Sequence, residues 1–176
     1  MLHQFNTIET SPTINDVCYD TLQLGKIIAS SYQPDIIIGV SRGGLIPAVF
    51  LSHFLKIPMI PVNFSGSQGQ GDKKFTEIEV LPEIDKHLKI LIVDDICDSG
   101  DTITKMIKYY KRQKNIVESA VLYYKDLWPH LASTDKKHGY IPSFFCHRIG
   151  DHTGWMTFPW ENSQQMILNL MSNKEV

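Results

Sequence analysis

The sequence predicts an α/β protein whose mainly parallel, twisted sheet is flanked by helices on both faces. Short apolar runs, such as residues 35–40 and 89–93, have the length and composition of strands buried in a parallel sheet. Segments of helical length, such as 45–55, separate these runs, and this alternation favours parallel pairing. The 176 residues, 43% of them hydrophobic, suffice for one domain with a proper core.

The expected elements alternate between helices and strands along the chain. Thr13, followed three residues later by Asp16, is typical of the start of an amphipathic helix. Pro58 and Pro61 interrupt the second strand, which favours an edge position in the sheet. The expected helices are about 14–28, 45–55, 103–114 and 164–171, and the expected strands are 35–40, 57–64, 77–81, 89–93, 118–124 and 140–146.

The composition limits the partners and the compartment that we expect. A formal net charge of −2 and a sequence pI of about 6.4 do not indicate a surface for nucleic acid. The longest apolar runs, such as 48–55, are too short to span a bilayer, and the N-terminus lacks a secretory pattern. Cys18, Cys97 and Cys146 are odd in number and widely spaced, which favours reduced thiols. We expect a soluble, cytoplasmic single domain over residues 1–176 that binds neither nucleic acid nor membrane.

Residues 90–102, ILIVDDICDSGDT, combine features that suit a ribose phosphate. The apolar strand leads to the adjacent carboxylates Asp94 and Asp95, which suit vicinal hydroxyls or a divalent ion. A short loop of small and hydroxyl residues then runs into a helix, whose first backbone N–H groups suit a phosphate. An Asp-Asp pair after a strand is also common as a loop start or helix cap. The order of strand, carboxylates and phosphate turn favours the functional interpretation.

This stretch resembles the phosphoribosyl-pyrophosphate binding motif of the type I phosphoribosyltransferases at all thirteen positions. The resemblance implies the fold of that family, with a core at about 35–125 and a small hood formed by terminal segments. Residues 126–161 and the N-terminal segment would form the hood and the base-binding part. Asp94 and Asp95 would hold the ribose diol. The ribose 5′-phosphate would lie on Ser99, Gly100, Asp101 and Thr102.

The segment Ser41-Arg42-Gly43-Gly44 follows the first buried strand and could hold a second anion. Its glycines allow close approach of the backbone, Arg42 supplies a fixed planar charge, and a helix begins after it. Glycine pairs after strands are common, so the motif is weak in isolation. Beside the downstream motif it resembles the pyrophosphate-binding loop of the same family, and Arg42 matches its charged position. The resemblance implies a cis peptide between Ser41 and Arg42 and a catalytic role for Arg42.

The features that indicate the accepting base resemble those of the 6-oxopurine branch, which uses hypoxanthine, guanine or xanthine. Lys125 follows a strand at the position of a lysine that donates to the 6-oxo group, and an ammonium rejects the amino group of adenine. Trp155 corresponds to the aromatic residue that stacks on the purine, with Met156 beside it. Asp98 corresponds to the catalytic aspartate that faces N7 and handles its proton. Taken individually, each of these residues has a simpler interpretation. A lysine after a strand is usually a solvated charge, and a tryptophan is usually part of the core or of an oligomer contact. An aspartate at this position can merely cap the next helix.

The resemblance implies a purine phosphoribosyltransferase that makes a nucleotide monophosphate and pyrophosphate in purine salvage. Its ligands would be phosphoribosyl pyrophosphate and a purine base, and its cofactor Mg²⁺, held through water by Asp94, Asp95 and Glu161. The glycine-rich loop 65–74 would close over the site. By resemblance we also expect a homo-oligomer, either a dimer or a tetramer. Two alternatives stay open: a nucleotide-sensing regulator that keeps the fold without catalysis, and an enzyme that uses a pyrimidine or another base.

Overall fold

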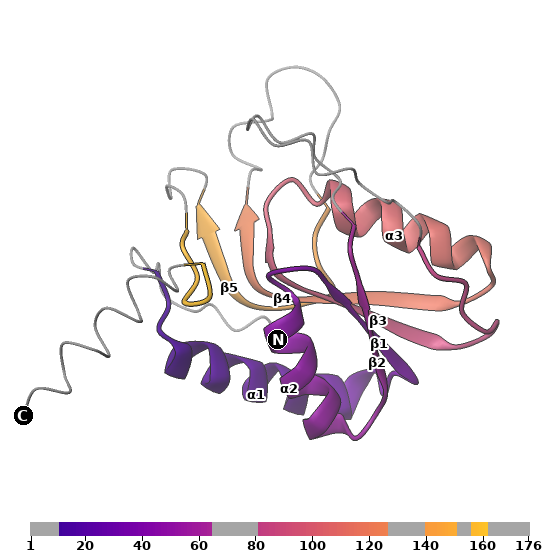
Figure 1. Ribbon diagram of the computed structural model, residues 1–176, viewed down its shortest axis with the longest axis horizontal. Coiled ribbons are helices and arrows are strands. Elements are labelled where there is room, and N and C mark those ends of the chain that lie inside the picture. Colours follow the sequence, from indigo (N-terminus) through magenta and orange to yellow (C-terminus); the bar gives the residue numbers. More distant parts are fainter. Residues whose placement is uncertain (1–10, 65–80, 127–139, 151–155, 162–176) are drawn as a thin grey trace, which may run out of the picture.

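A computed structural model describes residues 11–64, 81–126, 140–150 and 156–161 and contains the predicted sheet. Five parallel strands pair in the order β2-β1-β3-β4-β5 (Figure 1). This arrangement confirms the predicted α/β fold. The elements are α1 (Ile14–Ser31), β1 (Ile36–Val40), α2 (Leu45–Leu55), β2 (Met59–Val62), β3 (Lys89–Cys97), α3 (Asp101–Arg112), β4 (Ile116–Asp126) and β5 (Phe144–Gly150).

Helices cover both faces of the sheet, as predicted (Figure 1). On one face, α1 and α2 pack on the strands through a buried cluster that includes Leu24, Leu51 and Leu91. On the other face, α3 packs through a second cluster that includes Ile92 and Met106. Because β3 contributes to both clusters, its side chains are buried on both sides, which explains its continuous apolar run.

The start of α1 follows the predicted capping pattern. The Thr13 side chain accepts a hydrogen bond from the Asp16 N–H, and the Asp16 carboxylate accepts one from the Thr13 N–H. These reciprocal bonds satisfy two backbone donors that the helix itself cannot. None of the helices in the described residues is long and apolar enough to cross a membrane.

Several predicted boundaries were wrong at their ends. The last strand is Phe144–Gly150 instead of 140–146, because Pro142 has no N–H to donate and Ser143 bonds through its side chain to Glu118. The second strand is shorter than 57–64 and lies at the edge of the sheet, as its prolines indicated. β3 continues beyond residue 93 to Cys97, and α3 begins two residues earlier than expected. The predicted helix 164–171 and most of the predicted strand 77–81 lie outside the described residues, as do much of the expected hood and the loop 65–74.

Candidate active site

A pocket of about 980 Å³ opens at the carboxyl ends of the parallel strands. This is the edge at which open parallel sheets bind ligands, because the loops that follow neighbouring strands meet there. Its volume suits a ligand of nucleotide size. The residues that line it are Val40, Ser41, Arg42, Gly43, Leu45, Ile46, Phe64, Asp94, Asp95, Ile96, Asp98, Thr102, Lys125, Ile149, Met156, Phe158, Trp160 and Glu161.

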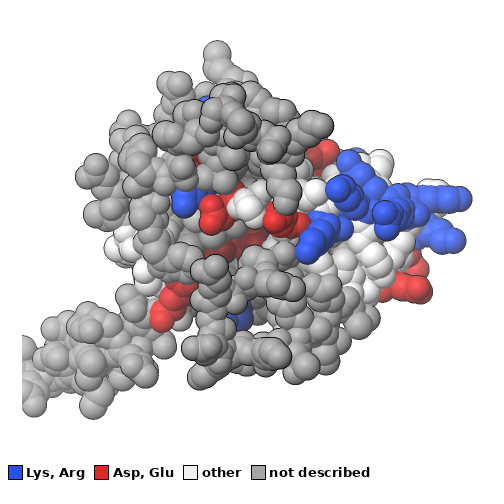
Figure 2. Space-filling model, turned by 90° about the horizontal axis from the view of Figure 1, so that it is seen from above, with Lys and Arg blue, Asp and Glu red and all other residues white. Residues whose placement is uncertain are grey.

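The pocket brings together most of the residues that the sequence indicated. Ten of them line it: Ser41, Arg42, Gly43, Asp94, Asp95, Asp98, Thr102, Lys125, Met156 and Glu161. Four others, Gly44, Ser99, Gly100 and Asp101, belong to the same loops but do not line it. Trp155, expected to stack on the base, lies outside the described residues. Seen from above, acidic side chains gather near the middle of the molecule and basic ones on one side (Figure 2).

Asp94 and Asp95 both face the pocket although they are neighbours in a strand. Consecutive side chains of a regular strand point to opposite faces. Here the alternation slips at the pair, since Val93 and Ile96 pack with the same hydrophobic cluster. The Asp95 N–H donates to Asp94 Oδ1 at 3.0 Å, and the Ile96 N–H donates to Asp95 Oδ1 at 2.8 Å. These local bonds stabilise the irregular backbone that presents two carboxylates to one ligand.

The environment of the pair opposes its negative charge. Burial, followed by the charge of Asp95, raises the pKa of Asp94 well above its usual range. Burial, with a further contribution from the charge of Glu161, raises the pKa of Asp95 to about 6. Carboxylates that share a dry site resist simultaneous ionisation. A divalent cation or a hydroxyl donor would therefore bind here with favourable electrostatics.

The loop that follows β1 packs directly on this pair. A Cβ atom added to Gly43 would lie 1.9 Å from Asp95 Oδ2, and one added to Gly44 would lie 2.4 Å from the Val93 carbonyl oxygen. Only glycine permits such an approach at these positions. The Ser41–Arg42 peptide is cis, as the resemblance implied. The Ser41 N–H donates to the Val62 carbonyl oxygen at 2.8 Å, so the edge strand β2 holds the start of the loop.

The loop after β3 turns sharply into α3. Gly100 has a positive φ of 76°, and a Cβ atom there would lie 2.6 Å from the Tyr140 Cβ. The Asp101 N–H donates to Ser99 Oγ at 3.3 Å. The Cys97 thiol donates to the Tyr140 carbonyl oxygen, and burial raises the pKa of Cys97 to about 12, which argues against a nucleophilic thiolate. The helix start is thus held close to the pocket, which Thr102 lines.

Lys125 and Asp98 both line the pocket and lie close to each other. Their Nζ and Oδ1 atoms lie 3.7 Å apart, although the residues come from the ends of different strands. The Lys125 side chain is 20% exposed and that of Asp98 is 60% exposed. A hydrogen-bond donor and a proton acceptor therefore stand side by side where a ligand could reach both.

Comparison with known proteins identifies the family. The model of the phosphoribosyl transferase domain matches residues 9–161, which is most of the chain and includes every residue that lines the pocket. The chain belongs to the phosphoribosyl transferase domain family. The predicted family is therefore confirmed.

Phosphoribosyltransferases of known type resemble the chain over much of its length. The xanthine-guanine phosphoribosyltransferase of Cereibacter sphaeroides is 28% identical over 137 residues, which are 74% of this chain and 71% of the relative. The hypoxanthine-guanine phosphoribosyltransferase of Streptococcus pyogenes is 28% identical over 118 residues, 63% of this chain and 66% of the relative. The crystal structure of a purine phosphoribosyltransferase from Pyrococcus horikoshii is 30% identical, with a TM-score of 0.69, and covers 88% of this chain and 96% of its own.

This phosphoribosyltransferase also has pocket residues that sequence reasoning missed. Phe158 and Trp160 line the pocket and stack with their ring centroids 4.9 Å apart and an interplanar angle of 9°. The Phe158 N–H donates to Glu161 Oε2 at 3.0 Å, which closes the turn that carries both rings. Residues 155–161 read WMTFPWE, with a second tryptophan beside a proline and an acidic residue, so the sequence held a signal for Trp160. Phe64 follows β2, and Ile149 lies near the end of β5. The sequence held no signal for these two residues, because apolar residues that line a pocket resemble core residues in sequence.

Proposed function

We propose that this phosphoribosyltransferase moves the 5-phosphoribosyl group from phosphoribosyl pyrophosphate to a 6-oxopurine base. The observation that carries the proposal is one pocket that combines a carboxylate pair, an Arg-Gly-Gly loop and the Lys125–Asp98 pair. The sequence relatives named above, which act on xanthine, hypoxanthine and guanine according to their names, support a base of this class.

The carboxylate pair would hold the ribose. The 2- and 3-hydroxyls of the sugar can donate to Asp94 and Asp95, which line the same pocket. Oxygen-rich carboxylates also suit Mg²⁺, whose binding would offset the raised pKa values of the pair. The described residues offer no complete cage of three or more metal-ligating side chains, which suits an ion held partly by water and by the substrate. With Glu161 nearby, these residues fit Mg²⁺, which would neutralise charge on the departing pyrophosphate.

The two loops would hold the phosphates. Arg42 and the backbone of Gly43 and Gly44 would bind the pyrophosphate, where negative charge grows as the bond from ribose C1 to oxygen breaks. The start of α3, with Ser99 and Thr102 hydroxyls, would bind the 5′-phosphate through backbone N–H groups and the helix dipole. The ribose would thus be held from both ends with C1 facing the base.

The Lys125–Asp98 pair would orient the base and manage its proton. O6 and N7 lie on the same edge of a 6-oxopurine, so adjacent groups can contact both. Lys125 would donate to O6, and Asp98 would accept the proton that the base loses at N7 as the bond from N9 to C1 forms. The pyrophosphate leaves with the electrons of the broken bond, and the products are a nucleoside monophosphate and pyrophosphate. A dimer or tetramer in the cytoplasm, taking part in purine salvage, completes this proposal.

The test is a panel of bases with the purified protein, phosphoribosyl pyrophosphate and Mg²⁺. We expect nucleotide formation, followed by absorbance, with one or more of hypoxanthine, guanine and xanthine, and none with adenine or a pyrimidine. Omitting the sugar donor is the control. Binding of a nucleotide without turnover of any base would favour the alternative, a nucleotide-sensing regulator. Turnover of adenine or a pyrimidine alone would overturn the assignment of Lys125.

A further inference from the structure

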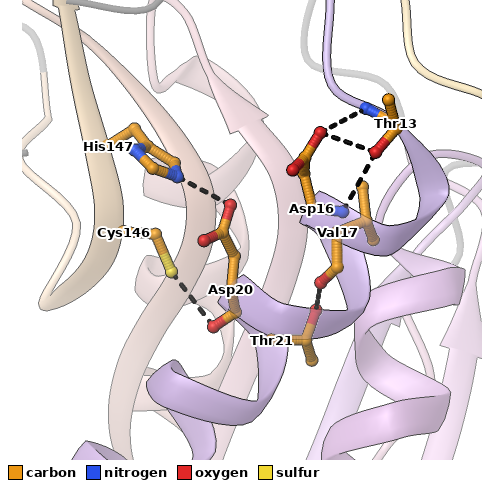
Figure 3. A network of polar contacts seen from close by, with 7 residues as sticks. All are labelled: Thr13, Asp16, Val17, Asp20, Thr21, Cys146 and His147. Atoms are coloured by element: carbon orange, nitrogen blue, oxygen red, sulfur yellow. Dashed lines mark hydrogen bonds and ion pairs between the residues drawn. The ribbon is translucent and has the colours of Figure 1, made fainter. Parts of the chain in front are cut away.

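A buried polar pair joins α1 to the strand β5. His147 Nε2 lies 2.6 Å from Asp20 Oδ2, although the residues are 127 positions apart (Figure 3). Both residues are buried, at 8% and 9% exposure. The Cys146 thiol donates to the Asp20 carbonyl oxygen at 3.3 Å, so β5 contacts α1 at two adjacent points. Buried polar side chains are costly unless they are bonded, so this pair fixes the two elements in one arrangement.

A series of aromatic contacts leads from this pair to the pocket. The His147 ring stacks on Tyr123 with centroids 4.8 Å apart and an interplanar angle of 22°. Tyr123 meets Phe158 edge to face at 5.7 Å, and Phe158 stacks on Trp160. Phe158 and Trp160 line the pocket, whereas Asp20, His147 and Tyr123 do not. Phe158 and Trp160 form one wall of the pocket. Their orientation therefore depends on contacts with rings that lie outside the pocket.

The segment that carries this wall has little structure of its own. Residues 156–161 form neither a helix nor a strand, so tertiary contacts must hold their rings in place. One such contact is the bond that the Thr157 N–H donates to Ser11 Oγ at 3.2 Å, in the segment that precedes α1. Another is the series of rings, whose last member, His147, bonds to Asp20 in α1. The two contacts link the wall to α1 and to the segment just before it.

We propose that Asp20 and His147 are positioning residues of the base-binding part of the pocket, acting through Tyr123 on Phe158 and Trp160. The inference rests on the proposed function, since it assigns this wall to the purine. The sugar and phosphate groups contact other loops, so the pair affects base binding selectively.

Steady-state kinetics of four variants tests the proposal. In Asp20→Ala the imidazole loses its bond to the carboxylate, and in His147→Gln the bond to Asp20 can persist while the stack on Tyr123 is lost. We expect both to raise the KM for the base by about three- to tenfold, the effect of weakening one aromatic contact. The KM for phosphoribosyl pyrophosphate should stay within about twofold. Asp20→Asn keeps a hydrogen-bonding group for either imidazole tautomer and should restore the base KM.

Ser52→Ala is the control for lost stability, because it removes a side-chain bond to the Ile57 carbonyl oxygen at the end of α2 and leaves the Asp20–His147 bond in place. It should lower stability and leave both KM values unchanged. Equal rises in the two KM values, a rise in base KM with Ser52→Ala, or an unchanged base KM in His147→Gln would overturn the proposal. If Asp20→Ala does not fold, as judged by circular dichroism, His147→Gln decides.

A separate measurement distinguishes this failure from failure of the proposed function. The chain has three tryptophans, so Trp128→Phe and Trp155→Phe leave Trp160 as the sole indole fluorophore. In that background we expect acrylamide to quench Trp160 more strongly in His147→Gln than in the parent. If the wild-type protein transfers no base but quenching of Trp160 increases in His147→Gln, the proposed function is refuted and the positioning role is supported. Unchanged quenching would refute the positioning role.

Discussion

Replacing Asp95 with asparagine should stabilise the protein at neutral pH while it abolishes function. Burial raises the pKa of Asp95 from 3.8 to about 6, so the folded state resists a charge that the unfolded chain carries freely. About two pKa units correspond to about 3 kcal/mol. The asparagine would carry no charge, and its side-chain oxygen could still accept the bond that the Ile96 N–H donates. Above pH 6 the wild type must bury a charged carboxylate when it folds, and the variant avoids this destabilisation.

The sign of the pH dependence follows from the direction of this shift. Well below pH 3.8 the carboxyl is protonated in both the folded and the unfolded state, so its burial does not destabilise the wild type. As the pH rises from 4 to 6, the unfolded chain loses its proton first, so the free energy of unfolding of the wild type falls. The free energy of unfolding of Asp95→Asn should therefore exceed that of the wild type by up to about 3 kcal/mol at pH 7.5 and by little at pH 4.

Urea unfolding at the two pH values, without Mg²⁺ or phosphoribosyl pyrophosphate, measures this difference. Asp85→Asn is the control, because it removes the same charge at an exposed position. Addition of Mg²⁺ and the sugar donor should stabilise the wild type by mass action and the variant much less. A variant that is less stable than the wild type at pH 7.5, or a difference that is equal at both pH values, would refute the reasoning.

Three further predictions concern the same pocket. Asp98→Asn keeps the shape but cannot accept a proton, so turnover should fall by about 10²- to 10⁴-fold; unchanged turnover would remove Asp98 from the mechanism. Lys125→Ala should raise the KM for the base far more than that for the sugar donor, and an equal rise in both would contradict its role. Lys108→Ala, on the exposed face of α3, is the control. Gly43→Ala would place a Cβ atom 1.9 Å from Asp95 Oδ2, so it should lower the melting temperature and raise the KM for phosphoribosyl pyrophosphate. A thermal scan and kinetics identical to wild type would show that the loop can move away from Asp95.

The sequence determined the elements whose signals are local. The capping pair Thr13 and Asp16 marked the start of α1, and Pro58 and Pro61 marked an edge strand. Residues 90–102 identified the family by their resemblance to its motif, because in this motif the strand, the two carboxylates and the phosphate turn are neighbours along the chain. Such features depend on neighbours in sequence, so they can be inferred without coordinates.

Other features of the site were decided only by the tertiary structure. The slip in alternation that turns Asp94 and Asp95 to the same pocket, and the raised pKa values that follow, depend on the pairing of β3 and on burial. The contact of Lys125 with Asp98 and that of Asp20 with His147 join residues from different elements. The sequence supplied the side chains, but their distances and their exclusion from water arise only when the sheet and its helices assemble, because electrostatics and packing depend on position in space.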